Sequence, residues 1–166
     1  MKTDEICFRK IIELKEQGSP WREIIALGYY DGPTSGLAKC RLCSSVYKFD
    51  LLTWDDRQDV RIYAFSPLPA SAFQQAIDAL APLGAPTWPV WVPIWQVPAE
   101  ERGVIDGRIS NLLGQAGMIK FVIASEHLAK DIMSAKLLTE SESALVSSGK
   151  PIDNDDWFTL LGLTRD

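Results

Sequence analysis

Residues 46–65 read VYKFDLLTWDDRQDVRIYAF, and this stretch decides the fold. In its first half, aromatic and aliphatic residues alternate with Lys48 and Asp50, which is typical of a strand with one covered face. The polar residues 55–59 then have the composition of a hairpin tip, and the apolar run 60–65 leads back. The sequence therefore predicts an antiparallel β-hairpin in the middle of the chain.

The residues before this hairpin favour helices. Thr3 is followed by two acidic residues, which is typical of a helix start, and apolar residues recur at helical spacing until Gly18. Ser19-Pro20 repeats the start signal, because serine is a favoured cap and proline is accepted at the first helical position. Residues 21–27 then offer a second apolar helical face. We expect an N-terminal helical hairpin.

The rest of the chain is expected to be mostly helical, with one later strand at 118–124. Apolar spacing and cap residues predict helices at 73–80 and 99–113, after Ser125, after Thr139 and from Asp155. The expected fold is therefore α+β and a single domain over residues 1–166. It consists of the helical hairpin, a central antiparallel β-hairpin or small sheet, and helices packed on one face.

Composition limits the classes of function. The 166 residues are 46% apolar and 23% charged, which suits one folded domain. The 22 acidic and 17 basic side chains give a net charge of −5, and the basic residues form no stripe. We therefore expect neither a nucleic-acid nor a membrane partner. The N-terminus lacks an apolar signal core, and three cysteines are too few for a disulfide framework, so we expect a cytoplasmic location.

The clearest motif is Cys40-Arg41-Leu42-Cys43, because two thiolates three positions apart can hold one metal ion from a tight turn. Over residues 36–52 the pattern resembles one half of a zinc ribbon, but a ribbon has a second pair of ligands. Those ligands would have to come from a symmetric partner or from elsewhere in this chain. The candidates in the chain are Cys7, His127 and a carboxylate such as Asp31. Zinc is the cofactor that this motif predicts.

Other interpretations of these residues stay open. Cys40 and Cys43 could be small buried residues at a turn or a redox pair, and Cys7 shares a helical face with apolar residues and suits the core. His127 is the single histidine, and the sequence shows no partner that would orient it for catalysis. The sequence contains neither a nucleophile elbow nor a phosphate-binding glycine loop. It therefore predicts no catalytic residues.

Residues 86–98 contain four prolines together with Trp88, Trp91 and Trp95, so this segment is expected to be extended. Indole rings on an extended segment offer flat apolar area to a partner, although they could equally be core. We expect a non-catalytic interaction or regulatory module that contacts another protein through this segment and the β-hairpin surface. Two alternatives remain. One is a small zinc-dependent or thiol-dependent enzyme centred on Cys40 and Cys43, and the other is a pocket for a small apolar ligand lined by the tryptophans. The oligomeric state is not predicted.

Overall fold

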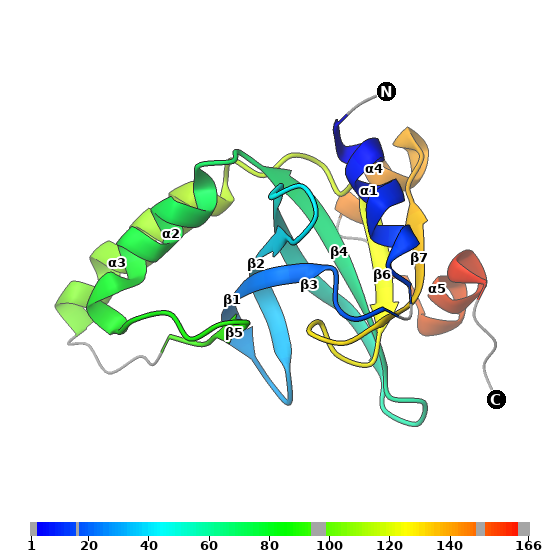
Figure 1. Ribbon diagram of the computed structural model, residues 1–166, viewed down its shortest axis with the longest axis horizontal. Helices are drawn as coiled ribbons and strands as arrows, with labels where there is room; N and C mark the ends of the chain where they lie inside the picture. Colours follow the sequence, from blue (N-terminus) through cyan, green and yellow to red (C-terminus); the bar gives the residue numbers. More distant parts are fainter. Residues whose placement is uncertain (1–2, 16, 94–98, 149–151, 163–166) are drawn as a thin grey trace.

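The structure is a computed structural model that describes residues 3–15, 17–93, 99–148 and 152–162. In these residues the chain forms a seven-stranded mixed sheet with the strand order β5-β1-β2-β3-β4-β6-β7. The strands are β1 (Trp21–Tyr29), β2 (Pro33–Cys40), β3 (Val46–Asp55), β4 (Val60–Leu68), β5 (Val90–Trp91), β6 (Phe121–Ser125) and β7 (Ile132–Leu137). Neighbouring strands are antiparallel except β5, which runs parallel to β1 (Figure 1). The α+β class is therefore confirmed.

The predicted central hairpin is confirmed as β3 and β4, with Phe49 opposite Phe65. Further strands pair with the outer edges of both β3 and β4, so the hairpin forms the middle of the sheet. Trp21 on β1 stacks on Phe65 of β4 with ring centroids 4.7 Å apart, although β2 and β3 lie between these strands in the sheet. The sheet must therefore curve strongly, and it encloses an aromatic core on its inner face.

The inner face is covered by α1 (Thr3–Glu13), which contributes Cys7 and Ile11 to this core. The opposite face is also apolar. Over β1 to β3 it packs against α2 (Ala72–Leu80) and α3 (Ala99–Leu113), and over β4 and β6 it packs against α5 (Asn154–Leu161). The expectation that helices pack on one face is therefore wrong, because Tyr63 on β4 faces the inner core and its neighbour Ile62 faces the outer one.

The predicted N-terminal helical hairpin is also wrong in its second arm. Residues 3–13 are helical as expected, but Trp21–Tyr29 is strand β1. Ile24 packs in the inner core and Ile25 in the outer one, so this strand is buried on both faces and lacks alternation. A short apolar run of this kind has no periodicity that separates a strand from a buried helix, and pairing with β2 decides the outcome.

The residues after Ser125 also differ from the expectation. The expected short helix there is wrong, because Ile132–Leu137 forms strand β7 and pairs with β6. Without β7, one edge of β6 would present unpaired backbone N–H and C=O groups. The hydrogen bonds that β7 makes with this edge outweigh the weak helical spacing of Leu128 and Ile132.

The later helices agree with the sequence signals. Thr139 caps α4 (Glu140–Ser147) through the predicted capping box with Glu142, and both reciprocal hydrogen bonds are present. Asp153 accepts hydrogen bonds from the first amides of α5. In the described part of the chain, none of the helices combines the length and the apolar character that crossing a bilayer requires.

Candidate metal centre

The β2–β3 turn brings Cys40 and Cys43 to the same place. β2 ends at Cys40, whose amide donates to the Ser45 carbonyl at 2.9 Å. The Ser44 amide donates back to the Cys40 carbonyl at 3.1 Å, and Ser44 takes the positive φ of 59° that the tight turn requires. The Arg41 amide donates to the Pro20 carbonyl at 2.9 Å, which ties this turn to the segment that follows α1.

Helix α1 supplies the third sulfur. Cys7 is 1% exposed and faces the inner core, one helical turn before Ile11. Its Sγ lies 2.9 Å from Cys43 Sγ, and the sulfur atoms of all three cysteines lie within 4.8 Å of one another. Two segments that are 33 residues apart in the sequence therefore meet in a cluster of three thiols. We call Cys7, Cys40 and Cys43 the thiol cluster.

The surroundings of the thiol cluster favour a thiolate at Cys40. A hydrogen bond from Cys7 lowers the pKa of the Cys40 thiol, and the backbone N–H groups of Leu42 and Cys43 lower it further. The same hydrogen bond to Cys40, together with burial, raises the pKa of Cys7. The Cys43 sulfur also lies 3.2 Å from the Ser45 hydroxyl. Backbone amides that donate hydrogen bonds to the first sulfur of a two-cysteine turn would also stabilise that sulfur as a metal ligand.

Tyr47 links the thiol cluster to the start of α1. Its ring is fully buried in the inner core, and its hydroxyl donates to Asp4 Oδ1 at 3.4 Å. Burial raises the pKa of Tyr47, and a hydrogen bond with Cys7 raises it further, so the phenol stays protonated. Asp4 and Cys7 lie one helical turn apart, and Tyr47 therefore contacts the face of α1 that carries the cluster.

The sulfur separations suit a metal ion bound by thiolates. A tetrahedral zinc ion with Zn–S bonds of about 2.3 Å places its sulfur ligands about 3.8 Å apart. The thiol cluster is near this value, since Cys7 Sγ and Cys43 Sγ are 2.9 Å apart and all three sulfur atoms lie within 4.8 Å of one another. Cys7 and Cys43 would have to move apart by about 0.9 Å to reach it. The three cysteines are thus close enough to hold one metal ion, with one coordination position left for another donor.

The other candidate ligands lie elsewhere. His127 Nδ1 accepts a hydrogen bond from the Ala129 amide at 3.1 Å, and a Cβ placed on Gly32 would contact its ring. His127 therefore lies in the β6–β7 loop and packs against the β1–β2 turn, outside the cluster. Asp31 lies in the same region, where its carbonyl accepts a hydrogen bond from Arg61 at 3.0 Å. The structure thus brings Cys7, and not these two residues, to Cys40 and Cys43.

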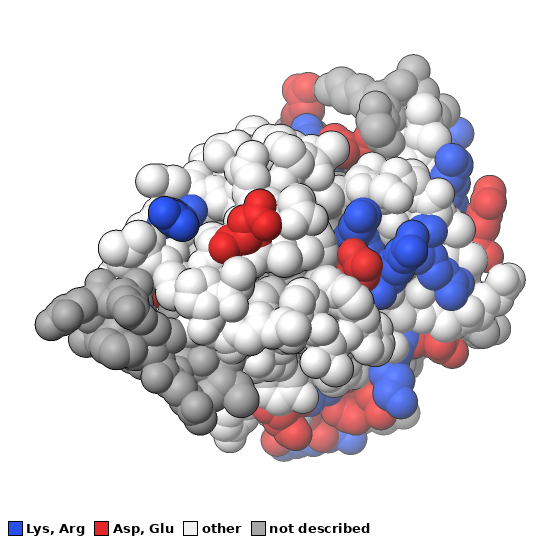
Figure 2. Space-filling view, turned by 60° about the vertical axis from the view of Figure 1, so that its left-hand side comes forward, with Lys and Arg blue, Asp and Glu red and all other residues white. Residues whose placement is uncertain are grey.

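Two tryptophans of the proline-rich segment, Trp88 and Trp91, have different environments. Trp91 on β5 is 5% exposed and packs in the outer core with α2 and α3. Trp88 is 37% exposed, and its ring lies 5.5 Å from that of Phe73. Trp95 lies outside the described residues. The face turned forward in Figure 2 bears few charged side chains.

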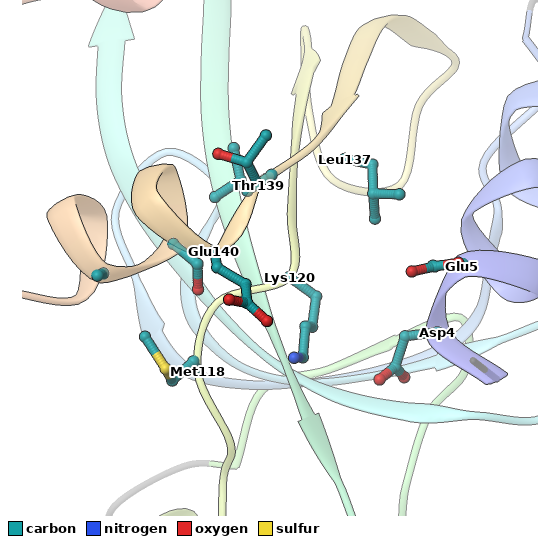
Figure 3. Close-up of a pocket in the computed structure, with 10 residues that line it drawn as sticks. Asp4, Glu5, Met118, Lys120, Leu137, Thr139 and Glu140 are labelled. Carbon is teal, nitrogen blue, oxygen red and sulfur yellow. The ribbon is translucent and has the colours of Figure 1, made fainter. Parts of the chain in front are cut away.

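Asp4 also lines a cavity of about 520 Å³ between α1, the start of β6 and α4. The Lys120 side chain points into it from the sheet, with Asp4 and Glu140 on either side (Figure 3). The cavity thus contains carboxylates and an amine on a partly apolar wall. The cavity lies near the thiol cluster, because Asp4 lines it and also accepts a hydrogen bond from Tyr47.

No protein family, curated protein or solved structure matches this chain. The functional argument therefore depends on the geometry. Sequence reasoning found Cys40 and Cys43 by their spacing but missed Tyr47 and Ser45 as neighbours of the sulfur atoms. Asp4 and Cys7 lie on a single helical face, and this spacing indicates that a residue hydrogen-bonded to Asp4, such as Tyr47, also lies near Cys7.

Proposed function

We propose that the protein binds Zn²⁺ through Cys7, Cys40 and Cys43, and that the ion fixes α1 on the inner face of the sheet. The observation that supports this proposal is the convergence of all three cysteine sulfurs of the chain within 4.8 Å. Thiolates are preferred ligands of zinc and poor ligands of magnesium or calcium.

Burial favours a bound cation over bare thiolates. Cys7 and Cys40 are buried, and an ionised group in such a place is costly unless it is paired. A zinc ion would offset most of the negative charge of the sulfur atoms and cross-link α1 to the β2–β3 turn. Such a site stabilises a fold as structural zinc sites do. We infer a non-catalytic, metal-stabilised module in the cytoplasm, where thiols remain reduced.

The enzyme alternative has less support from the same geometry. A thiol-dependent or zinc-dependent reaction needs a substrate next to the sulfur or the metal ion. Two of the three cysteines are buried, and Cys43 alone is partly exposed. The hydroxyl groups next to the sulfur atoms are the Tyr47 phenol, whose pKa is raised, and the Ser45 hydroxyl. Neither is a good general base near neutral pH.

The test is zinc uptake by reduced, chelator-treated protein, measured by competition with a chromophoric chelator and by metal analysis after gel filtration. We expect one zinc per chain in the natural protein and loss of that zinc in Cys43→Ser. Leu42→Ala is the matched control, because it alters the same turn at an exposed side chain without removing a sulfur. His127→Ala should also retain the metal. Equal uptake by Cys43→Ser, or no uptake by the natural protein, would contradict the proposal.

A second proposed function is protein binding at the proline- and tryptophan-rich segment. Trp88 is 37% exposed and Val92 is 41% exposed, and they lie at and beside the short edge strand β5. An apolar, weakly charged edge of this kind suits another protein or a small apolar ligand. Trp91 is buried and would support this surface from behind.

Trp88→Ala tests this second function, with Tyr30→Ala as a control. Tyr30 is another exposed aromatic residue, at 74%, in the β1–β2 turn. A protein partner should be retained by the natural protein and by Tyr30→Ala and lost by Trp88→Ala. A small apolar ligand should instead change the indole fluorescence of the natural protein, and Trp88→Phe should remove that change. Binding that survives both Trp88 substitutions excludes this surface.

A further inference from the structure

We propose that Cys7 and Cys43 form a reversible disulfide bond when a hydroperoxide reaches the thiol cluster, and that this bond and the metal ion exclude each other. The disulfide itself depends only on the arrangement of the sulfur atoms. The exclusion of the metal rests on the proposed zinc site.

The two sulfur atoms are already close to bonding distance. Cys7 Sγ and Cys43 Sγ are 2.9 Å apart, and a disulfide bond is about 2.05 Å long. The sulfur atoms must therefore approach by about 0.9 Å to form this bond. Zinc binding would move the same two atoms in the opposite direction, toward about 3.8 Å. The cluster thus lies between two alternative states.

The exposure of the cysteines determines the order of the steps. Cys43 is partly exposed, whereas Cys7 and Cys40 are buried. A hydroperoxide can therefore reach the Cys43 sulfur first, and the buried neighbour then acts as the resolving cysteine. We assign this role to Cys7 because its sulfur lies 2.9 Å from that of Cys43.

The oxidant is a hydroperoxide, and the disulfide forms in two steps. The Cys43 sulfur attacks the terminal peroxide oxygen and the O–O bond breaks. The sulfur loses two electrons and becomes a sulfenic acid, while the peroxide leaves as an alcohol, or as water when the oxidant is hydrogen peroxide. The Cys7 sulfur then attacks the Cys43 sulfur, the S–O bond breaks, and the hydroxide leaves with the Cys7 proton as water. The net result is two thiols converted to one disulfide, and a dithiol reductant reverses it.

Disulfide formation changes the capacity of the thiol cluster to bind a metal ion. The disulfide removes two of the three sulfur ligands, and Cys40 alone is not a zinc site. Helix α1 nevertheless stays attached to the β2–β3 turn, because the new bond joins the same two segments. Oxidation would therefore release the metal while it preserves the position of α1.

The first experiment treats metal-free protein with hydrogen peroxide and maps the linkage by mass spectrometry under non-reducing conditions. We expect an intact mass lower by two hydrogens, a peptide pair joined through Cys7 and Cys43, and full reversal by dithiothreitol. Cys40→Ser should form the same linkage, whereas Cys43→Ser and Cys43→Ala should form none. A Cys40–Cys43 linkage, a dimer joined through cysteines, or irreversible oxidation of Cys43 alone would overturn the proposal.

The second experiment repeats the oxidation on zinc-loaded protein and follows released zinc with a chromophoric chelator. One zinc should be released for each Cys7–Cys43 disulfide formed, and retention of zinc by the oxidised protein would contradict the exclusion. The two proposals fail separately. If metal-free protein forms the linkage but takes up no zinc, the disulfide stands and the zinc site does not. If zinc binds and the linkage never forms, the reverse holds.

Discussion

The two ends of the central sheet are closed by different chemistry. At one end the β2–β3 turn meets α1 through the thiol cluster. At the other end Arg61, which is 5% exposed, holds three loops together. Its guanidinium donates to Asp59 Oδ1 and to the Asp31 carbonyl, each at 3.0 Å, and also to the Glu126 carbonyl. The guanidinium also lies over the Trp54 ring, 4.3 Å from its centroid.

The two ends differ in whether their side chains can change chemical state. A guanidinium stays protonated at any physiological pH and presents its donors in a fixed plane, so the arginine end has one arrangement. Thiols can be protonated, bound to a metal or oxidised. A metal- or redox-dependent property of this protein is therefore expected at the thiol end, and Arg61 is expected to have a structural role.

The largest expected effect is metal-dependent stability at the thiol end. Zinc at about 1,000 times its Kd should raise the free energy of unfolding of the natural protein by about 4 kcal/mol, because the ion binds the folded chain. Cys43→Ser should show no such increase, and Leu42→Ala should show all of it. Chemical unfolding with and without zinc measures this difference. An increase of equal size in Cys43→Ser would mean that the ion binds elsewhere.

The sequence predicts those features of the two ends that depend on residues close together in the chain. The β3–β4 hairpin alternates because its residues at 47–51 have one buried and one more exposed face, so it is visible in the sequence. Strand β1 is buried on both faces, so its sequence does not alternate and wrongly predicts a helix. The spacing of Cys40 and Cys43 is local as well, and the sequence shows it directly.

The remaining parts of both sites depend on long-range packing. Cys7 has the pattern of a core residue, and only the position of α1 on the sheet brings it to Cys43. Arg61 has the appearance of an ordinary polar residue near a hairpin tip, because its partners come from loops 30 and 65 residues away. His127 lies beside that arginine rather than beside the cysteines, for the same reason.

Arg61→Met should produce the next largest effect. It removes the charged donor from the carbonyls of Asp31 and Glu126 while keeping an apolar side chain near Trp54. Hydrogen bonds to charged groups contribute about 1.5–3 kcal/mol, so we expect a loss of about 2–3 kcal/mol in the free energy of unfolding. Urea unfolding measures it. Arg57→Met is the matched control, because Arg57 is exposed in the adjacent β3–β4 turn, and its loss should be negligible.

The arginine end should leave zinc uptake unchanged if the two ends are independent. Arg61→Met and the natural protein should then bind zinc with the same affinity at a temperature where both are folded. A large loss of zinc affinity in Arg61→Met would show that the two ends are coupled through the sheet, and the comparison between a switchable and a structural end would fail.

The smallest expected effect is a pH dependence at His127. Burial lowers the pKa of this imidazole below its usual 6.5, and the positive charges of Arg61 and Lys130 lower it further, while Glu126 and Asp31 oppose them. Between the lowered pKa and 6.5 the unfolded chain binds more protons than the folded one, so stability falls as the pH drops below about 6.5. His127→Gln should remove that part of the decline. Unfolding in chelator at several pH values tests this, and parallel curves for the two proteins would contradict it.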